Sequence, residues 1–157
     1  MITTDAGEFA AALAPSRPLV GLDLGTRTIG VALSDRRRGI ATPGRTLKRT
    51  KFTPDAQALL AQAAQAEACG LVLGLPLNMD GSEGPRAQST RAFALGLSRL
   101  TGLPILLWDE RLSTVAAERA LIEADLSRRR RAEVVDSVAA GLILQGALDR
   151  LARLTGQ

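Results

Sequence analysis

Histidine is absent from this 157-residue chain, and cysteine occurs only once, at Cys69. Without histidine the chain cannot form a Ser-His-Asp or Cys-His nucleophile pair, a histidine-ligated zinc site or a nuclease site with a histidine base. A single cysteine excludes an internal disulfide and a cysteine-based zinc site, and it fits a reducing compartment such as the cytoplasm. Any acid–base chemistry would therefore rest on carboxylates and hard metal ions.

Aromatic residues and long apolar runs are also scarce. Tyrosine is missing, and Phe and Trp together make up 3% of the chain. We therefore expect little stacking of aromatic side chains on nucleic-acid bases, and recognition of a nucleic acid by its shape fits better. No apolar run reaches the length of a membrane span, and residues 1–17 lack the basic start and apolar core of a signal peptide. We expect a cytoplasmic protein without a membrane partner.

Arginine is what the sequence has in excess. Lys48 and Lys51 are the only lysines among 20 basic residues, and the formal net charge is +4. The planar fork of arginine suits phosphate, which favours a nucleic-acid partner, although the composition of the genome could produce the same bias. With 46% hydrophobic residues the length fits one domain with a proper core. We expect an N-terminal extension over 1–17 and a single domain over 18–157.

The hydrophobic pattern predicts an α/β fold. Two apolar stretches flank the turn at Gly25 and Thr26, which is typical of a β-hairpin, and a third strand follows in which Pro43 favours an edge position. Single helices separate the later strands, which indicates parallel neighbours joined by right-handed crossovers. The sequence thus predicts a five-stranded mixed sheet, with three antiparallel strands followed by two parallel ones, and helices on both faces.

The expected boundaries follow from capping residues, prolines and glycines. Strands are predicted over 19–24, 29–33, 40–47, 71–75 and 104–108, helices over 5–13, 53–70, 85–102, 113–124 and 133–154, and a basic linker over 126–131.

Acidic residues stand at matching places on three of these elements. Asp23 lies near the end of the first strand, Glu110 just past the end of the fifth, and Asp136 in the first turn of the last helix. Helical periodicity from Asp136 leads to Ala139, Ala140, Ile143 and Ala147, which indicates that Asp136 is on the face that packs against the sheet. Each acid also has a simpler explanation, such as a turn cap, a surface ion pair or a helix-dipole contact.

Carboxylates that converge repel one another and raise one another's pKa unless a cation neutralises them. A set of oxygen ligands alone selects Mg²⁺ or Mn²⁺. Two such ions about 4 Å apart can activate water and stabilise the leaving oxygen in phosphodiester cleavage without histidine. The three acids therefore predict a two-metal site for phosphodiester hydrolysis.

Four stretches resemble the YqgF/RuvX family of the RuvC-like branch of the ribonuclease H-like fold. They are GLDLGTRTIGVALSD, GLPLNMDGSEGPRA, WDERLSTVAAERALIEADLSRRRR and DSVAAGLILQGALD, in the order of the family. The resemblance implies a metal-dependent nuclease, linked to maturation of the 5′ end of 16S ribosomal RNA and to Holliday-junction resolution. It assigns the acidic roles to Asp23, Glu110 and Asp136. Thr28 after Arg27, and Ser137 after Asp136, stand where relatives often carry a basic residue, which leaves less positive charge for phosphate.

Several other side chains are candidates for holding the substrate. Arg111 could hold a phosphate or orient Glu110, and Asn78 and Asp80 lie on the carboxyl edge where parallel sheets bind ligands. Helix N-terminal NH groups and basic runs add further contacts with phosphate. The substrate-binding candidates are Arg27, Asn78, Arg111, Ser113, Thr114, Arg128, Arg129, Arg130 and Arg131, with 36–38 and 48–51 as further basic runs.

Two other functions stay open. The chain could be a noncatalytic nucleic-acid-binding processing factor that keeps the fold. The hairpin with Asp23, Gly25 and Thr26 also resembles the phosphate hairpin of sugar kinases and chaperone ATPases, but those proteins close two such domains over ATP. For a nuclease, the sequence leaves open structured RNA or branched DNA as substrate, and symmetric cutting of a junction would need a homodimer.

Overall fold

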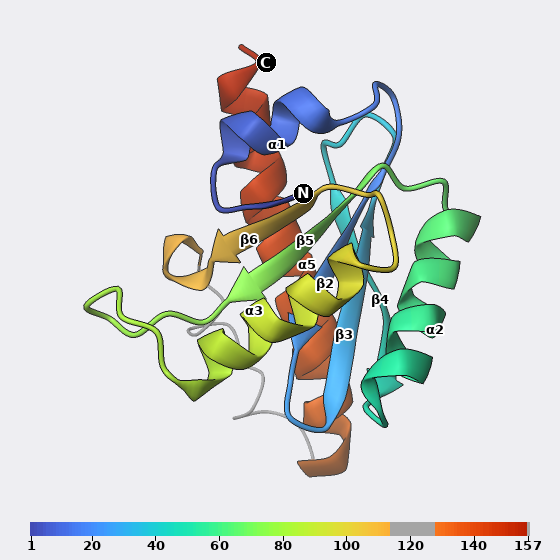
Figure 1. Ribbon diagram of the computed structural model, residues 1–157, viewed down its shortest axis with the longest axis vertical. Helices are drawn as coiled ribbons and strands as arrows, with labels where there is room; N and C mark the ends of the chain where they lie inside the picture. Colours follow the sequence, from blue (N-terminus) through green and yellow to red (C-terminus); the bar gives the residue numbers. More distant parts are fainter. Residues whose placement is uncertain (114–127, 157) are drawn as a thin grey trace.

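A six-stranded mixed sheet forms the centre of the molecule, with the strand order β1-β6-β5-β2-β3-β4 (Figure 1). The computed structural model describes residues 1–113 and 128–156, without the side chains of 128–136. Its strands are β1 (Ile2–Thr3), β2 (Leu19–Leu24), β3 (Thr28–Ser34), β4 (Ala41–Lys48), β5 (Gly70–Leu75) and β6 (Ile105–Asp109). Its helices are α1 (Ala6–Ala12), α2 (Phe52–Gln65), α3 (Pro85–Ser98) and α5 (Arg128–Leu154), with a 3₁₀ turn, η1, at Glu110–Leu112.

The pairing of the strands confirms the predicted fold class. β2, β3 and β4 form an antiparallel meander, and β5 and β6 extend it in parallel from β2. Pro43 belongs to β4, an edge strand, and pairs with Ala32 of β3. An edge strand tolerates the missing N–H of proline. The bulge between Gly30 and Ala32 bends the same pair of strands.

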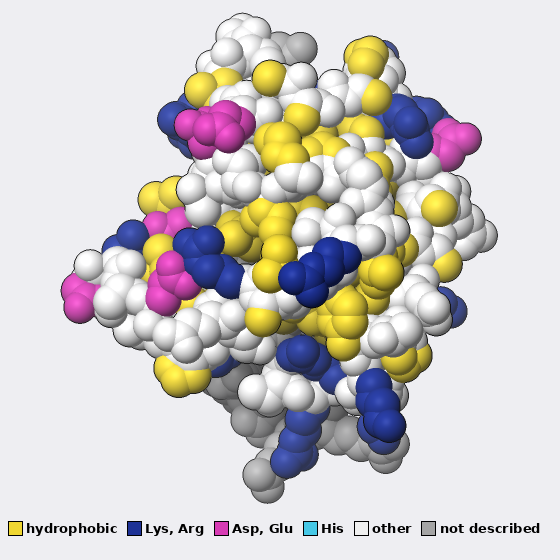
Figure 2. All heavy atoms as spheres, viewed as in Figure 1, with side chains coloured by type: hydrophobic (Ala, Val, Ile, Leu, Met, Phe, Trp, Pro, Cys, Tyr) yellow, Lys and Arg dark blue, Asp and Glu magenta, His cyan; other side chains and the backbone are white. Residues whose placement is uncertain are grey.

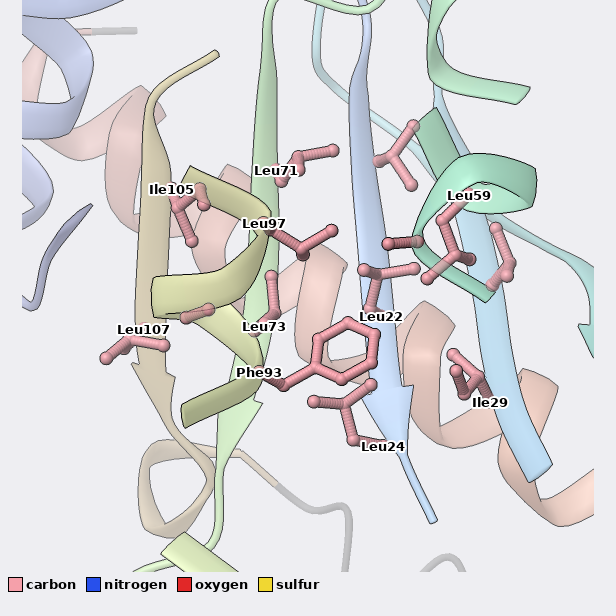
Figure 3. Packing of buried hydrophobic residues seen from close by; sticks show 14 of the residues in the cluster. Leu22, Leu24, Ile29, Leu59, Leu71, Leu73, Phe93, Leu97, Ile105 and Leu107 are labelled. Atoms are coloured by element: carbon pink, nitrogen blue, oxygen red, sulfur yellow. The ribbon is translucent and has the colours of Figure 1, made fainter. Parts of the chain in front are cut away.

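Helices cover both faces of the sheet (Figure 1). Leucines at alternate positions of β2, β5 and β6 face α2 and α3, and in Figure 3 they surround Phe93 and Leu97 of α3. The intervening positions face α1 and α5, where Ile143, Leu144 and Leu148 are fully buried. Because both sides of the central strands are covered, β2 and β5 are buried at every residue.

Helix α5 packs very closely on the sheet, because glycines face it. A Cβ on Gly21 would lie 2.7 Å from Leu144 Cβ and 3.1 Å from the carbonyl oxygen of Ala140. On β5, a Cβ on Gly74 would lie 2.5 Å from Ile143 Cδ1. At Gly21 the close atoms belong to the backbone and Cβ of α5, so glycine is required there for the helix to sit where it does. At Gly74 the close atoms are the ends of the Ile143 and Glu110 side chains, which would have to shift to admit a Cβ.

Residues predicted as an N-terminal extension over 1–17 include a strand and a helix that pack against the sheet. β1 pairs in parallel with β6 and adds the sixth strand, one more than the sequence predicted. Helix α1 is capped by Asp5, which accepts bonds from the N–H groups of Gly7 and Glu8 at 2.7 and 3.1 Å. Phe9 is completely buried against the α5 side of the sheet. A strand of two residues is too short to leave a hydrophobic pattern in the sequence.

The predicted boundaries of three helices were wrong. Helix α2 begins one residue before Thr53 and ends at Gln65, because Glu67 takes a left-handed conformation with φ of 59° and turns the chain. Gly70, the predicted stop, instead opens β5, and α3 ends at Ser98 before the predicted stop at 102. Helix α5 begins at Arg128, so 128–131 are helical rather than a linker. The helix predicted over 113–124 lies almost entirely outside the described residues.

None of the helices in the described part of the chain is both long and apolar enough to cross a membrane.

Candidate active site

Asp23 occupies the end of the central strand β2 and is 2% exposed. Its alternate neighbours Leu19 and Gly21 contact α1 or α5, so Asp23 lies on the α5 side of the sheet. Its oxygen Oδ2 is buried. A carboxylate in this position needs positive charge or hydrogen-bond donors nearby if it is to stay ionised.

Glu110 reaches the same place from the other side of β5. It is the first residue of η1, directly after β6, and its Oε1 lies 3.0 Å from the position of a Cβ on Gly74. Gly74 is one residue beyond Leu73, whose partner on β2 is Leu22, so it lies beside Asp23. The missing side chain of Gly74 therefore leaves the space in which the Glu110 carboxylate approaches Asp23.

Asp136 belongs to α5, but its side chain lies outside the described part of the structure. The side chains that are described therefore include two of the three predicted acids, and among them no group of three metal-binding residues is complete. Asp136 is the one member of the predicted acidic set that the described side chains leave out.

The chemistry of Asp23 and Glu110 fits a hard divalent cation. Both supply carboxylate oxygens, and Asp23 Oδ2 and Glu110 Oε1 are buried at the edge of the sheet where β2 and β5 end. No nitrogen or sulfur ligand accompanies them among the described residues, because the chain has no histidine and its one cysteine, Cys69, lies at the start of β5. Oxygen ligands of this kind favour Mg²⁺ or Mn²⁺ over zinc or copper.

Arg111 contacts Asp109, the last residue of β6, rather than Glu110. Its Nη2 and Nε donate to the Asp109 carboxylate at 2.8 and 3.1 Å, and its Nη1 donates to the carbonyl oxygen of Met79 at 3.3 Å. The hydrogen bonds and charge of Arg111 lower the pKa of Asp109, and Asp109 raises the pKa of Arg111 in return. Arg111 thereby links the loop after β5 to the turn that carries Glu110.

The loop after β5 is held together by its own polar side chains. Asn78 Nδ2 donates to Ser82 Oγ at 2.9 Å, and Asp80 Oδ1 accepts from the N–H and hydroxyl of Ser82 at 2.9 and 2.6 Å. These bonds lower the pKa of Asp80. Gly81 has a φ of 88°, which a side chain would oppose. Asn78 and Asp80 thus shape the loop, while Met79 at its tip is exposed.

The remaining predicted substrate contacts are spread over several places. Ser113 donates its N–H and its hydroxyl to the carbonyl oxygen of Glu110 at 3.3 and 3.0 Å, so it closes η1 and has no N–H to offer a phosphate. Arg27 is exposed in the β2–β3 turn, close to the acids in sequence. Thr114 lies outside the described residues, as do the side chains of 128–131. The basic run 36–38 lies in the β3–β4 turn, at the opposite end of the sheet from Asp23.

Two arginines lie against the turn that follows Asp23: Arg49, from the predicted basic run 48–51, and Arg86, which the sequence analysis did not single out. Arg49 Nη1 donates to the carbonyl oxygen of Gly25 at 2.7 Å, and Arg86 Nη2 donates to that of Leu24 at 3.3 Å. The Arg49 guanidinium also lies 5.6 Å from the ring centre of Phe93. Seen from the α2–α3 face, Lys and Arg side chains gather towards this end of the molecule, whereas Asp and Glu lie at its sides (Figure 2).

Comparisons with known proteins find a matching family and close relatives. Residues 17–150 match the model of a family described as "RuvX: Holliday junction resolvase". Proteins from Rhodobacter capsulatus and Ruegeria pomeroyi are 68% and 67% identical over 98% of this chain and 97% and 100% of their own length, and both are named "Putative pre-16S rRNA nuclease".

Two solved structures show the same fold at low sequence identity. T. thermophilus RuvC in complex with a Holliday junction substrate has a TM-score of 0.55 at 9% identity, covering 87% of this chain and 96% of that one. The yeast mitochondrial Holliday junction resolvase Ydc2 has a TM-score of 0.51 at 12% identity, covering 96% and 86%. They support the ribonuclease H-like fold of the RuvC type that the sequence predicted.

Proposed function

Because the chain belongs to the RuvX family, we propose that it is an endonuclease that hydrolyses phosphodiester bonds with the help of Mg²⁺ or Mn²⁺. Asp23, Glu110 and Asp136 would hold the ions. The names of the bacterial relatives favour precursor 16S ribosomal RNA as a substrate, and the description of the family favours a four-way DNA junction. On a junction, symmetric cutting needs two sites and therefore a homodimer.

The observation that carries this proposal is that the buried carboxylate of Asp23 and the half-buried carboxylate of Glu110, with its Oε1 buried, approach each other across a glycine. Asp23 and Glu110 come from elements that are 87 positions apart in the sequence, and both lie against Gly74 at the carboxyl edge of the sheet. Burying two acids together costs free energy unless a cation or a dense set of donors compensates them. Such an arrangement is typical of sites that bind hard metal ions and catalyse phosphoryl chemistry.

The position of α5 supports Asp136 as the third acid of the proposed site. The carbonyl oxygen of Ala140 lies 3.1 Å from where a Cβ on Gly21 would be, which fixes the level of the helix relative to β2. Asp136 is four helical residues before Ala140, a rise of about 6 Å, and Asp23 is two strand residues beyond Gly21, a rise of about 6.6 Å. The backbones of both acids therefore reach nearly the same level at this edge.

Each part of the site has a distinct role in the proposed reaction. Bound divalent ions would lower the pKa of a water molecule and stabilise charge on the leaving oxygen. Asp23 and Glu110 provide oxygens from rigid elements, and Ile143 closes the inner side of the site because its Cδ1 fills the space beside Gly74. Arg49 and Arg86 hold the turn that follows Asp23 and bring positive charge towards an incoming phosphate.

The test offers two substrates, a precursor 16S RNA with its 5′ leader and a four-way DNA junction, each with Mg²⁺ or Mn²⁺. We expect the wild type to cut at least one of them, and Asp23→Asn, Glu110→Gln and Asp136→Asn each to lower the rate roughly a hundredfold or more, because each removes a proposed metal ligand. Asp149→Asn is the matched control, since Asp149 is exposed on the same helix as Asp136 and should leave the rate unchanged.

Two results would count against the proposal. If the purified wild type binds both substrates but cuts neither with either metal, the chain is a noncatalytic processing factor. If cleavage persists in Asp23→Asn and Glu110→Gln at the wild-type rate, the two carboxylates are not the catalytic groups.

A further inference from the structure

A second concave site lies at the other end of the molecule from the acids. It is a cavity of about 380 Å³ between α1, the β3–β4 turn and the last turns of α5. Leu13 and Ser16 line it from the segment after α1, and 36–38 line it from the turn. Leu151 lines it from α5, and Thr155 from directly after that helix. Figure 1 shows α1 beside the C-terminal end of α5, away from η1 and the loop that follows β5. Its volume lies at the lower end of the range of small-ligand sites, about 300 to 1,000 Å³.

The cavity is lined by positive charge. Three arginines contribute to its wall, and no carboxylate is among the residues that line it. Arg38 is half-buried, and its Nη1 donates to the carbonyl oxygens of Ala14 and Arg17 at 2.9 and 3.0 Å rather than to an acid. Carbonyl partners leave the charge of the guanidinium uncompensated, so the cavity favours an anion.

Arg36 and Arg37 differ in how they are engaged. Arg36 lines the cavity but forms an ion pair with Glu67, which is not one of the residues that line it. Arg37 is exposed on the wall, so its guanidinium can reach a ligand from solvent. Asp35, the acid closest in sequence, accepts from the N–H groups of Gly39 and Ile40 at 2.8 and 3.0 Å and stabilises the turn itself.

The wall of the cavity is held in an unfavourable backbone conformation. Ser16 and Arg38 both line it, and both have left-handed φ angles, of 58° and 56°. Non-glycine residues adopt this conformation at an energetic cost and keep it only where the surroundings enforce it. Here the side chain of Arg38 binds the segment that contains Ser16, which fixes the two strained residues relative to each other.

We propose that this cavity binds one nucleotide of the nucleic-acid substrate, at a distance from the bond that is cut. Arg37 and Arg38 would contact the phosphate, while Leu13 and Leu151 offer an apolar wall to the sugar and base. The proposal rests on the proposed nuclease function, because it assigns a second contact to the same substrate. It predicts a recognition site that acts on substrate affinity and register, and not on the chemistry at the acids.

The length of α5 gives the separation of the two sites. Leu151 and Thr155 follow Asp136 by 15 and 19 helical residues, which corresponds to about 22 to 28 Å. A B-form duplex rises about 3.4 Å per base pair, so the cavity would meet the nucleotide roughly six to eight positions from the cleaved bond. Substrates with an arm shorter than that should not reach it.

The experiment measures the affinity of the full chain for two fluorescent duplex-armed substrates by anisotropy, in a chelator so that neither is cut. One substrate carries a 12-base-pair arm and the other a 4-base-pair arm, about twice and half the predicted reach. Arg37→Ala removes a charge, and Ala152→Phe fills the cavity without changing charge. The matched controls are Arg99→Ala and Ala64→Phe, at exposed positions just after α3 and within α2.

We expect both cavity variants to weaken binding of the long-armed substrate about threefold to tenfold and to leave the short-armed one unchanged. Arg37→Ala should also reduce the slope of log affinity against log salt by about one, because one phosphate contact is lost. The control variants should change neither value.

Equal weakening on both substrates, or weakening by Arg99→Ala as large as that by Arg37→Ala, would overturn the assignment of a distinct site. Unchanged affinity in both cavity variants would overturn it as well, as would binding of free AMP with no effect on the long-armed substrate. Since the readout is binding without metal, a protein that never cuts fails the proposed function but can still pass or fail this test.

Discussion

At the scale of single residues, Gly74 sets the geometry of the candidate site. The same missing side chain admits Ile143 of α5 and the carboxylate of Glu110, so one position controls both helix packing and the approach of the acids. Its neighbour Asp23 stays buried because both sides of the sheet are covered at this point. Stability and the proposed catalysis would therefore depend on the same small space.

We predict that Gly74→Ala lowers the free energy of unfolding by about 1 to 3 kcal/mol, because its Cβ would lie 2.5 Å from Ile143 Cδ1. Combining it with Ile143→Val removes that atom and should restore part of the stability. Cleavage should stay low in both variants, because the Cβ still lies 3.0 Å from Glu110 Oε1. Urea denaturation and a cleavage assay measure the two effects.

Gly102→Ala is the control for this substitution, since no atom lies within 4 Å of the added Cβ. A Gly74→Ala protein that cuts as fast as the wild type would show that Glu110 does not need this space.

Residue types and their places in the sequence were enough to select Asp23 and Glu110, because strand ends at one edge of a sheet must lie close together. The partner of Arg111 was not predictable in this way. The sequence places Arg111 next to Glu110 and two residues after Asp109, and only the 3₁₀ geometry of η1 decides in favour of Asp109. Side-chain pairing in a turn depends on backbone angles that composition does not encode.

At the scale of elements, the N-terminal segment is the largest departure from expectation. The cap at Asp5 and the prolines at 15 and 18 predicted the ends of α1 correctly. Whether this helix packs against the sheet depends instead on contacts with distant residues. A Cβ on Gly70 would lie 2.9 Å from the ring of Phe9. The ring therefore fits against the start of β5 because Gly70 has no side chain. No local pattern shows that a glycine and a phenylalanine 61 positions apart will meet.

We predict that Phe9→Ala lowers the free energy of unfolding by about 3 to 5 kcal/mol, as expected for a completely buried ring. Leu100→Ala is the control, since Leu100 is 52% exposed and its loss should cost less than about 0.5 kcal/mol. Chemical denaturation of both variants at one pH provides the measurement. A small effect at Phe9 would mean that the N-terminal segment is a dispensable extension after all.

At the scale of the whole molecule, the strands carry two sites with different charge at opposite ends. The acids lie where β2 ends, and the arginine-lined cavity lies beyond Leu19, where β2 begins. The fold class and the parallel order of β5 and β6 were predictable, because they follow from the alternation of strands and helices. The cavity was not, because it forms only when α1 and the end of α5 come together.

Metal binding should appear as a gain in stability of the entire chain. Anything that binds only the folded state stabilises it by mass action, by about 2.7 kcal/mol when the ligand is at a hundred times its Kd. We predict this gain with Mn²⁺ for the wild type and for Asp149→Asn, and a much smaller one for Asp23→Asn and Glu110→Gln. Thermal unfolding with and without Mn²⁺ measures it, and an equal gain in all four proteins would place the ion elsewhere.

The pairing of β1 with β6 has a consequence for how the chain is made. Ile2 and Thr3 find their partners at Ile105 and Leu106, which the ribosome synthesises about a hundred residues later. During translation β1 therefore has no strand to pair with until about a hundred further residues have emerged, and the sheet cannot be completed before then. A nascent chain arrested before position 105 should leave its leading residues open to proteases, and one released after β6 has formed should protect them.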